Sequence, residues 1–298
     1  MTTGITRTFR ADEFDAATLA RAKRGQRVSV CIPARDEAAT VGPIVAAVVA
    51  GLVESCGLVD EVLVVDDHSV DTTAAVAAAA GATVVAAPDV LPGHADGPGK
   101  GEALWKSLFV STGDLVVWCD ADVTNFDPAF VVGLLGPLLT RPDVALVKAF
   151  YERPFEGRPG GGGRVTELVA RPVLSLLFPH LAGILQPLGG EYAGRREVLE
   201  QVPFERGYGV EIGLLVDVAA RFGVEAVAQV DLGVREHRNR PLDQLAVAAV
   251  AVLRAALERA PVPVPDVVTL ARPTGPPVEV VGGSLPALAD LPDYRRSA

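Results

Sequence analysis

Cysteine is scarce in this sequence. The 298 residues include 3 cysteines, Cys31, Cys56 and Cys119, an odd number in which no pair is spaced as C-x-x-C. Two of them lie in apolar runs typical of strands, where a small buried thiol packs well. The sequence therefore indicates neither a disulfide framework nor a zinc site.

Long apolar runs are also missing. The longest, at 41–53 and 74–87, contain Pro43 or Gly81 and are shorter than the roughly 18 residues that a membrane-spanning helix needs. The first ten residues carry arginines but lack the apolar centre of a secretory signal. We therefore expect no transmembrane helix and a cytoplasmic location.

Basic residues are outnumbered by acidic ones. Lys and Arg total 27 against 37 Asp and Glu, a formal net charge of -10, which argues against a general nucleic-acid binder because like charges repel. Aromatic residues make up 5% of the chain, whereas 49% of it is hydrophobic, mainly Ala, Val and Leu. This composition is globular, and the length suits one large α/β domain with additions or two small domains.

Short β-branched runs alternate with longer Ala- or Leu-rich runs from Arg27 onward, the pattern of repeated βαβ units. Expected strands lie at 28–32, 61–65, 83–86 and 115–119, and expected helices at 40–54, 72–80 and 100–111. Such a chain predicts a mostly parallel, Rossmann-like sheet flanked by helices. Ligands of these sheets bind at the carboxyl ends of the strands, so the loops that begin at Pro33, Asp66, Ala87 and Asp120 are the candidates.

The second half of the chain is less regular. We expect strands at 145–150 and 226–232, helices at 164–177, 209–221 and 242–260, and a mobile loop at the four glycines of 160–163. After Pro261 the chain is rich in Pro and Gly. That composition predicts a poorly ordered tail or one draped over the surface.

Two common nucleotide-binding motifs are absent. The first expected strand ends in Pro33-Ala34-Arg35-Asp36-Glu37, without the glycine turn of a dinucleotide-binding site, which argues against an NAD-dependent dehydrogenase. The segment 93–101 lacks the first glycine of a P-loop and has Gly101 in place of its Ser or Thr, which excludes a P-loop kinase. Lys100 in a glycine-rich turn can still bind a phosphate, although a solvated loop explains it equally well.

The strongest local feature is the apolar run 115–119, which leads directly into Asp120-Ala121-Asp122. Two carboxylates at the end of a central strand can hold a hard divalent cation that bridges a nucleotide diphosphate. The alternative is a turn with two solvated aspartates.

Two further clusters suit an anionic substrate. Arg235-Glu236-His237-Arg238-Asn239-Arg240 concentrates three arginines and a histidine in six residues of an acidic protein; the imidazole can bind a metal and the arginines can bind phosphate or carboxylate groups. Gly163, Arg164 and Thr166 stand at the start of an expected helix, which favours anions. A solvated basic turn and an N-capped helix are the respective alternatives.

Taken together, these segments resemble the actinobacterial glucosyl-3-phosphoglycerate synthases, and the resemblance runs from about residue 28 to residue 260. The motifs that carry it are 33–37, Pro98-Gly99-Lys100-Gly101-Glu102-Ala103-Leu104-Trp105, Asp120-Ala121-Asp122, 161–167, Gly207-Tyr208-Gly209-Val210-Glu211 and 235–241. The resemblance implies an α/β GT-A glycosyltransferase fold. It further implies four parts: an N-terminal extension (1–26), a nucleotide-sugar-binding half (27–143), an acceptor-binding and catalytic half (144–260) and the tail (261–298).

The activity that this resemblance implies is retaining transfer of glucose from a nucleotide diphosphate sugar, usually UDP-glucose, to the 2-hydroxyl of 3-phospho-D-glycerate. Mg²⁺ or Mn²⁺ is required, and a homodimer is implied. A front-face route, in which the departing phosphate accepts the proton of the incoming hydroxyl, is expected to serve this chemistry, with a Glu211 nucleophile as the alternative.

Carried over to matching positions, the resemblance implies a role for each of the following residues. The donor would be bound by Pro33, Ala34, Glu37, Asp67, Lys100, Asp120, Ala121 and Glu191, and the metal by Asp122 and His237. The acceptor would be bound by Gly163, Arg164, Thr166 and Asn239, and the reaction centre would be lined by Tyr208, Glu211, Arg235 and the Leu188 backbone carbonyl.

The sequence departs from the family pattern where the base and ribose bind. Family members commonly have Asn-Glu where this chain has Asp36-Glu37, and Ser-Gly where it has Asp67-His68. Because guanine offers more donors to a carboxylate than uracil does, Asp67 could select a different base. A GDP-sugar, a mannose donor or another phosphorylated acceptor therefore stays open.

Two other function classes compete with a sugar transferase. A nucleotidyltransferase would need a glycine-rich basic loop where Pro33 stands. A non-catalytic nucleotide sensor would bind its ligand tightly without turnover.

Overall fold

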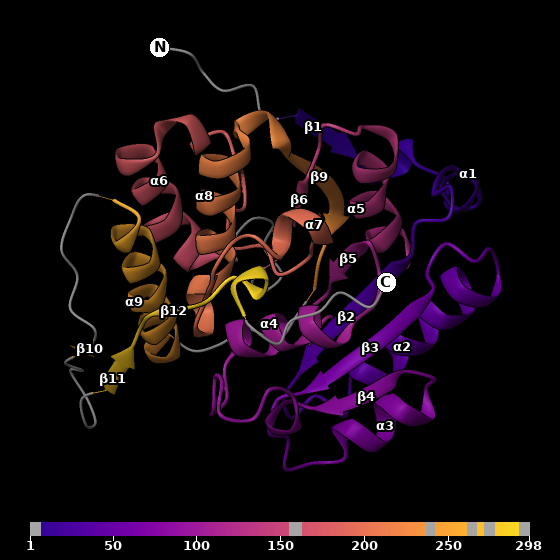
Figure 1. Cartoon of the computed structure of the whole chain (residues 1–298), viewed down its shortest axis with the longest axis horizontal. Helices are drawn as coiled ribbons and strands as arrows, with labels where there is room; N and C mark the ends of the chain where they lie inside the picture. Colours follow the sequence, from indigo (N-terminus) through magenta and orange to yellow (C-terminus); the bar gives the residue numbers. More distant parts are fainter. Residues whose placement is uncertain (1–6, 155–162, 237–241, 261–266, 271–277, 292–298) are drawn as a thin grey trace.

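The computed structural model describes residues 7–154, 163–236, 242–260, 267–270 and 278–291 (Figure 1). Its centre is an eight-stranded sheet. The strands follow the order β1 (Arg7–Arg10), β9 (Val227–Val234), β6 (Leu146–Glu152), β7 (Tyr192–Arg195), β5 (Leu115–Trp118), β2 (Val28–Ala34), β3 (Glu61–Asp66) and β4 (Thr83–Ala86). All neighbours pair in parallel except β7, which is antiparallel to both β5 and β6. The predicted α/β fold with a mostly parallel sheet is confirmed.

Helices cover both faces of this sheet, each with its own hydrophobic core. One face packs against α1 (Ala16–Ala22), α2 (Val41–Val48), α3 (Thr73–Ala79) and α5 (Ala129–Thr140). The other packs against α4 (Lys100–Val110), α6 (Arg171–Leu177), α8 (Val210–Phe222) and α9 (Leu242–Glu258). In Figure 1, β2–β4 with α2 and α3 occupy one end of the molecule and α6, α8 and α9 the other.

Short elements complete the described chain. They are η1 (Ala11–Glu13), η2 (Val49–Glu54), η3 (Ala87–Asp89), η4 (Thr166–Ala170), η5 (Pro179–Leu181), α7 (Arg196–Leu199), β8 (Phe204–Glu205), η6 (Gly207–Gly209), η7 (Val224–Ala226), β10 (Val267–Leu270), β11 (Val278–Val281), β12 (Ser284–Leu285) and η8 (Leu288–Asp290). Two are π-helical turns: η2 continues α2, and η4 leads into α6. No helix among these residues is both long and apolar enough to cross a bilayer.

Helix α5 and strand β7 have no counterpart among the expected elements. Residues 130–138 of α5 are all buried, so this helix shows no polar face and no 3.6-residue period from which to predict it. Strand β7 has four residues, Tyr-Ala-Gly-Arg, and owes its place to pairing with β5 and β6. It separates the parallel halves of the sheet.

The described part of the tail differs from the expectation. Leu285 and Leu288 are 4% and 1% exposed and belong to a core cluster. Strand β12 pairs antiparallel with β8, and Trp105 Nε1 in α4 donates a hydrogen bond to Pro286 O at 3.0 Å. A surface-draped tail is therefore wrong for these residues, because their apolar side chains fill space beside α4.

Candidate active site

The two carboxylates of the Asp120-Ala121-Asp122 segment follow β5, whose four residues are all fully buried. This places them at the carboxyl edge of the parallel strands, where ligands of such sheets bind. Gly190 is needed for this placement, since a Cβ there would lie 2.0 Å from Asp120 Oδ2. The loop before β7 thus packs directly against Asp120.

Lys100 joins this edge from the first residue of α4. Its Nζ lies 2.6 Å from Asp120 Oδ1 and 2.7 Å from Glu211 Oε1. Glu211 lies in the first turn of α8. Burial lowers the pKa of Lys100, but the carboxylates of Asp120 and Glu211 outweigh burial and hold that pKa well above its ordinary value. Lys100 is therefore a cation bound by acidic groups of two different elements.

Arg235, just after β9, binds three further carboxylate oxygens. Its Nη2 lies 2.8 Å from Asp120 Oδ2 and 3.1 Å from Asp122 Oδ1, and its Nε lies 2.9 Å from Glu191 Oε1. The residue is 2% exposed. The structure thus brings together six of the residues expected from the sequence, namely Lys100, Asp120, Asp122, Glu191, Glu211 and Arg235.

The pKa values of the two aspartates are shifted in opposite directions. Burial raises the pKa of Asp120, but Lys100 and Arg235 outweigh burial and hold that pKa far below its usual range. Burial and the Asp120 charge raise the pKa of Asp122, and Arg235 and Lys100 offset this rise incompletely. Of the two aspartates, Asp122 therefore has the less compensated charge, and it would gain more from an added cation.

The donor set fits Mg²⁺ or Mn²⁺. Four carboxylates meet two cations in direct contact with them, so the cluster carries surplus negative charge and offers the oxygen ligands that these metals prefer. Among the described residues no three His, Cys, Asp or Glu side chains already converge as a metal site. Asp122 is the described candidate ligand, and His237 and Asn239 lie outside the described residues.

The loop that carries Asp122 is tied to the chain that leads to residue 237. Asn125 Nδ2 donates to Val234 O at 2.9 Å, and Asn125 Oδ1 accepts from Glu236 N at 2.8 Å. Thr124 N donates to Glu236 O at 3.0 Å. These bonds hold the two loops in register beside Arg235.

Three residues of β6 and the following turn belong to this site but were not expected from the sequence. Tyr151 OH donates to Glu191 Oε2 at 2.5 Å and accepts from Arg153 Nη2 at 2.9 Å, so both support the buried Glu191. Lys148 Nζ donates to Gly189 O at 2.7 Å. The sequence feature that could have indicated them is the placement of two basic residues, Lys148 and Arg153, on either side of Tyr151 in and after the predicted strand 145–150.

The expected base-binding residues lie at the ends of β2 and β3. Asp67 N donates to Ala34 O at 2.8 Å, next to Pro33. Asp67 Oδ2 accepts from Gly99 N at 3.0 Å, and its Oδ1 lies 3.0 Å from His68 Nδ1. Asp67 therefore connects β3 to the start of α4.

Glu37 stands apart from the acidic cluster. Its backbone N donates to Thr73 Oγ1 at 2.8 Å, which anchors the loop after β2 to the start of α3. Ala121, between the two aspartates, is 4% exposed and packs into the core beneath the loop.

The expected acceptor residues stand at the start of η4. Gly163 has a φ of +75°, and a Cβ there would lie 3.5 Å from Arg153 Nη1. Arg164 follows it, and Thr166 is 3% exposed. The Arg153 side chain, which also reaches Tyr151 OH, therefore passes close to Gly163.

The remaining expected residues surround the cluster. Tyr208 lies in η6, where Gly207 N donates to Glu102 Oε2 at 2.9 Å, so the first turn of α4 holds this turn close to Glu211. Leu188 is partly buried against the core in the short segment before Gly190.

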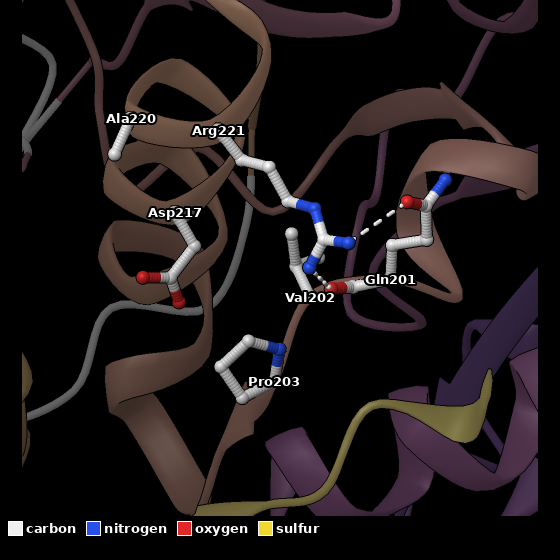
Figure 2. A pocket seen from close by; sticks show the side chains of 6 residues that line it. All are labelled: Gln201, Val202, Pro203, Asp217, Ala220 and Arg221. Carbon is white, nitrogen blue, oxygen red and sulfur yellow. Dashed lines mark hydrogen bonds between the residues drawn. The ribbon is translucent and has the colours of Figure 1, made fainter. Parts of the chain in front are cut away.

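A separate pocket lies at the far end of α8 (Figure 2). Arg221 donates to Gln201 O at 2.8 Å and to Gln201 Oε1 at 3.0 Å across it. Arg221 is ten residues from Glu211 along the helix, about 15 Å at the usual rise. None of the residues that line it contacts the acidic cluster, so the pocket is distinct from the candidate active site.

The contact between Gly190 and Asp120 generates a first prediction. Gly190→Ala forces a methyl group into a carboxylate that Lys100 and Arg235 hold, and we expect it to lower the free energy of unfolding by about 1–3 kcal/mol. Gly51→Ala is the matched control, because its Cβ meets only the Pro128 side chain, at 3.2 Å or more. Urea unfolding of both variants measures the difference; equal stabilities would contradict the packing described here.

Comparisons with known proteins agree with this architecture. The model of glycosyl transferase family 2 matches residues 29–201. The glucosyl-3-phosphoglycerate synthase of Mycolicibacterium paratuberculosis is 52% identical over 86% of this chain and 79% of its own length, and that of Petrotoga mobilis is 48% identical over 80% and 74%.

A solved structure is similarly close. The crystal structure of glucosyl-3-phosphoglycerate synthase from Mycobacterium tuberculosis with Mn²⁺, UDP-glucose and phosphoglyceric acid superposes with a TM-score of 0.88 at 45% identity, covering 96% of this chain and 98% of that chain. A structure of the same enzyme with Mg²⁺ and UDP gives a TM-score of 0.85 at 45% identity, covering 96% and 99%. The chain therefore belongs to glycosyl transferase family 2 and, within it, to the glucosyl-3-phosphoglycerate synthases.

Proposed function

We propose that this protein transfers glucose from UDP-glucose to the 2-hydroxyl of 3-phosphoglycerate, with retention of anomeric configuration. The observation that carries the proposal is the cluster of Asp120, Asp122, Glu191 and Glu211 around Lys100 and Arg235. It lies in a chain that matches a synthase solved with Mn²⁺, UDP-glucose and phosphoglyceric acid over 96% of its length.

Departure of the nucleotide diphosphate requires electrostatic stabilisation. Negative charge develops on the diphosphate as the glucosyl bond breaks, and a preorganised cation lowers the energy of that state. Lys100 and Arg235 are the cations in direct contact with the carboxylate cluster. Mg²⁺ or Mn²⁺, held by Asp122 and His237 in a D-x-D motif with Asp120, would supply Lewis-acid neutralisation of the same leaving group.

Glu211 is better suited to positioning than to nucleophilic attack. Its Oε1 lies 2.7 Å from Lys100 Nζ, and a carboxylate paired with an ammonium at this distance is a weaker nucleophile. A front-face transfer therefore fits better, with the departing phosphate taking the hydroxyl proton. In this arrangement the Leu188 carbonyl lies near the anomeric carbon, Glu191 holds sugar hydroxyls, and Tyr208 lines the reaction centre.

The nucleotide base is proposed to be uracil. Both carboxylate oxygens of Asp67 already have partners within the chain, Gly99 N and His68 Nδ1. A carboxylate oxygen that already accepts a hydrogen bond within the loop is less available to accept one from guanine. Pro33, Ala34 and Glu37 complete the uridine site in this proposal, and Ala121 lies beside the ribose.

The acceptor is proposed to bind at the start of η4. Gly163, Arg164 and Thr166 together offer backbone amides, a guanidinium and a hydroxyl to the phosphate and carboxylate of 3-phosphoglycerate, with Asn239 as a fourth contact. This division assigns the nucleotide of the donor to residues 27–143, and the acceptor and the reaction centre to residues 144–260. We also propose a homodimer, as the family resemblance implies, and a cytoplasmic location.

The reaction is tested by product formation. The protein with MgCl₂ is supplied with UDP-, GDP- or ADP-glucose, or the mannose counterparts, together with 3-phosphoglycerate, and the product is identified by mass spectrometry. We expect a hexosyl-phosphoglycerate with UDP-glucose as the preferred donor. Preference for GDP would overturn the base assignment, and binding without turnover would indicate a sensor instead of an enzyme.

The acceptor site has its own prediction. Arg164→Ala removes charged hydrogen bonds worth about 1.5–3 kcal/mol, so the KM for 3-phosphoglycerate should rise roughly 10- to 150-fold while that for UDP-glucose changes little. Arg171→Ala is the control, because this arginine lies seven residues further along the same helical stretch and pairs with Glu167 at 2.8 Å on the surface. Equal changes in both KM values would remove Arg164 from the acceptor site.

A further inference from the structure

Lys148 is a buried basic residue to which the reaction described above gives no role. It lies in β6 and is 1% exposed. Its Nζ donates to Gly189 O at 2.7 Å and lies 4.1 Å from the centroid of the Tyr192 ring, on the paired strand β7. Burial lowers the pKa of Lys148 to about 7, against the opposing influence of the Glu211 and Glu191 carboxylates.

Stability does not explain a lysine at this position. Burying an ammonium group costs free energy that an apolar side chain of similar length would avoid. Within the described part of the chain, Gly189 O is the one hydrogen-bond acceptor that Lys148 Nζ reaches. The distinctive effect of the ammonium is therefore to hold that carbonyl, with the Tyr192 ring as its apolar support.

Gly189 belongs to a segment whose position matters for the reaction. It follows Leu188, whose carbonyl is assigned to the anomeric carbon, and precedes Gly190, which packs against Asp120. A Cβ at Gly189 would lie 2.8 Å from Ala149 O, so the segment also approaches the backbone of β6 closely.

A second bond ties the same segment to β6. Gln186 Nε2 donates to Tyr151 O at 2.5 Å, and Gln186 O accepts from Gly189 N at 3.0 Å. Segment 186–190 is thus held to β6 by one side chain from each partner, Gln186 from the segment and Lys148 from the strand. Of these two side chains, Lys148 is the one that binds beside Leu188.

We propose that Lys148 is a positioning residue for glucosyl transfer: by holding Gly189 O it fixes the Leu188 carbonyl and the Gly190 contact with Asp120. The inference rests on the proposed function. Lys148 contacts no reacting atom and acts through segment 186–190. Its loss should therefore impair the chemical step more than donor binding, since small misplacements near reacting atoms are costly to rate.

The test is Lys148→Met, which keeps the apolar stem and removes the ammonium. We expect kcat to fall roughly 10- to 100-fold while the KM for UDP-glucose stays within about threefold. Hydrogen–deuterium exchange of a peptide covering 186–191 should also rise in the unliganded protein. That second readout requires no substrate.

Lys106→Met is the matched control. Lys106 is also 1% exposed, and its Nζ also donates to a backbone carbonyl, Ala87 O, at 2.7 Å. The Lys106→Met variant should leave the hydrogen–deuterium exchange of peptide 186–191 unchanged. If Lys148→Met does not fold, Gln186→Met tests the same tether and should also raise exchange in this peptide.

The outcomes separate the inference from the proposed function. Unchanged kcat and unchanged exchange in Lys148→Met would overturn the positioning role, as would a rise in the KM for UDP-glucose that matches the fall in kcat/KM. A wild-type protein without transfer to 3-phosphoglycerate would overturn the proposed function. In that case increased exchange at 186–191 would still show that Lys148 holds the segment.

Discussion

The structure depends on the balance of charge at the carboxyl edge of β5. Four carboxylates gather there because strands from distant parts of the chain end, and helices begin, at one place, and such a cluster is unstable without cations. Lys100 and Arg235 contact all four of its members, and Asp120 is shared between them. Asp122, whose pKa stays raised, is the aspartate at which compensation is less complete. An added divalent cation would reduce this imbalance.

Each component of the cluster is carried by a different element, so the fold itself sets the geometry. The start of α4 supplies Lys100, the end of β5 supplies the aspartates, and the first turn of α8 supplies Glu211. The chain after β9 adds Arg235, and the loop before the antiparallel strand β7 adds Glu191. Strand β7 brings this last loop between the two parallel halves of the sheet. Residues from the first and the second half of the chain therefore meet at one edge of the sheet.

Much of this was predictable from the sequence, and the exceptions have physical reasons. The run 115–119 leading into two aspartates identified the centre, because parallel strands end at a shared edge. Lys148 and Tyr151 were not predicted because their partners, Gly189 and Glu191, lie about forty residues away in the sequence. Both partners precede β7, a strand of four residues that is too short to show a hydrophobic pattern. Helix α5 was missed because burial on all sides removes its period. The tail was misjudged because its Pro and Gly content concealed two core leucines.

The affinity for Mn²⁺ in the presence of UDP tests the central claim most directly. Electron paramagnetic resonance can count free Mn²⁺ for the wild type, for Asp122→Asn and for a control, Asp143→Asn, whose carboxylate pairs with Arg7 on the surface. The charge-balance account predicts that Asp122→Asn weakens binding roughly 100-fold or more, while the control matches the wild type. Equal affinity in all three proteins would contradict the account.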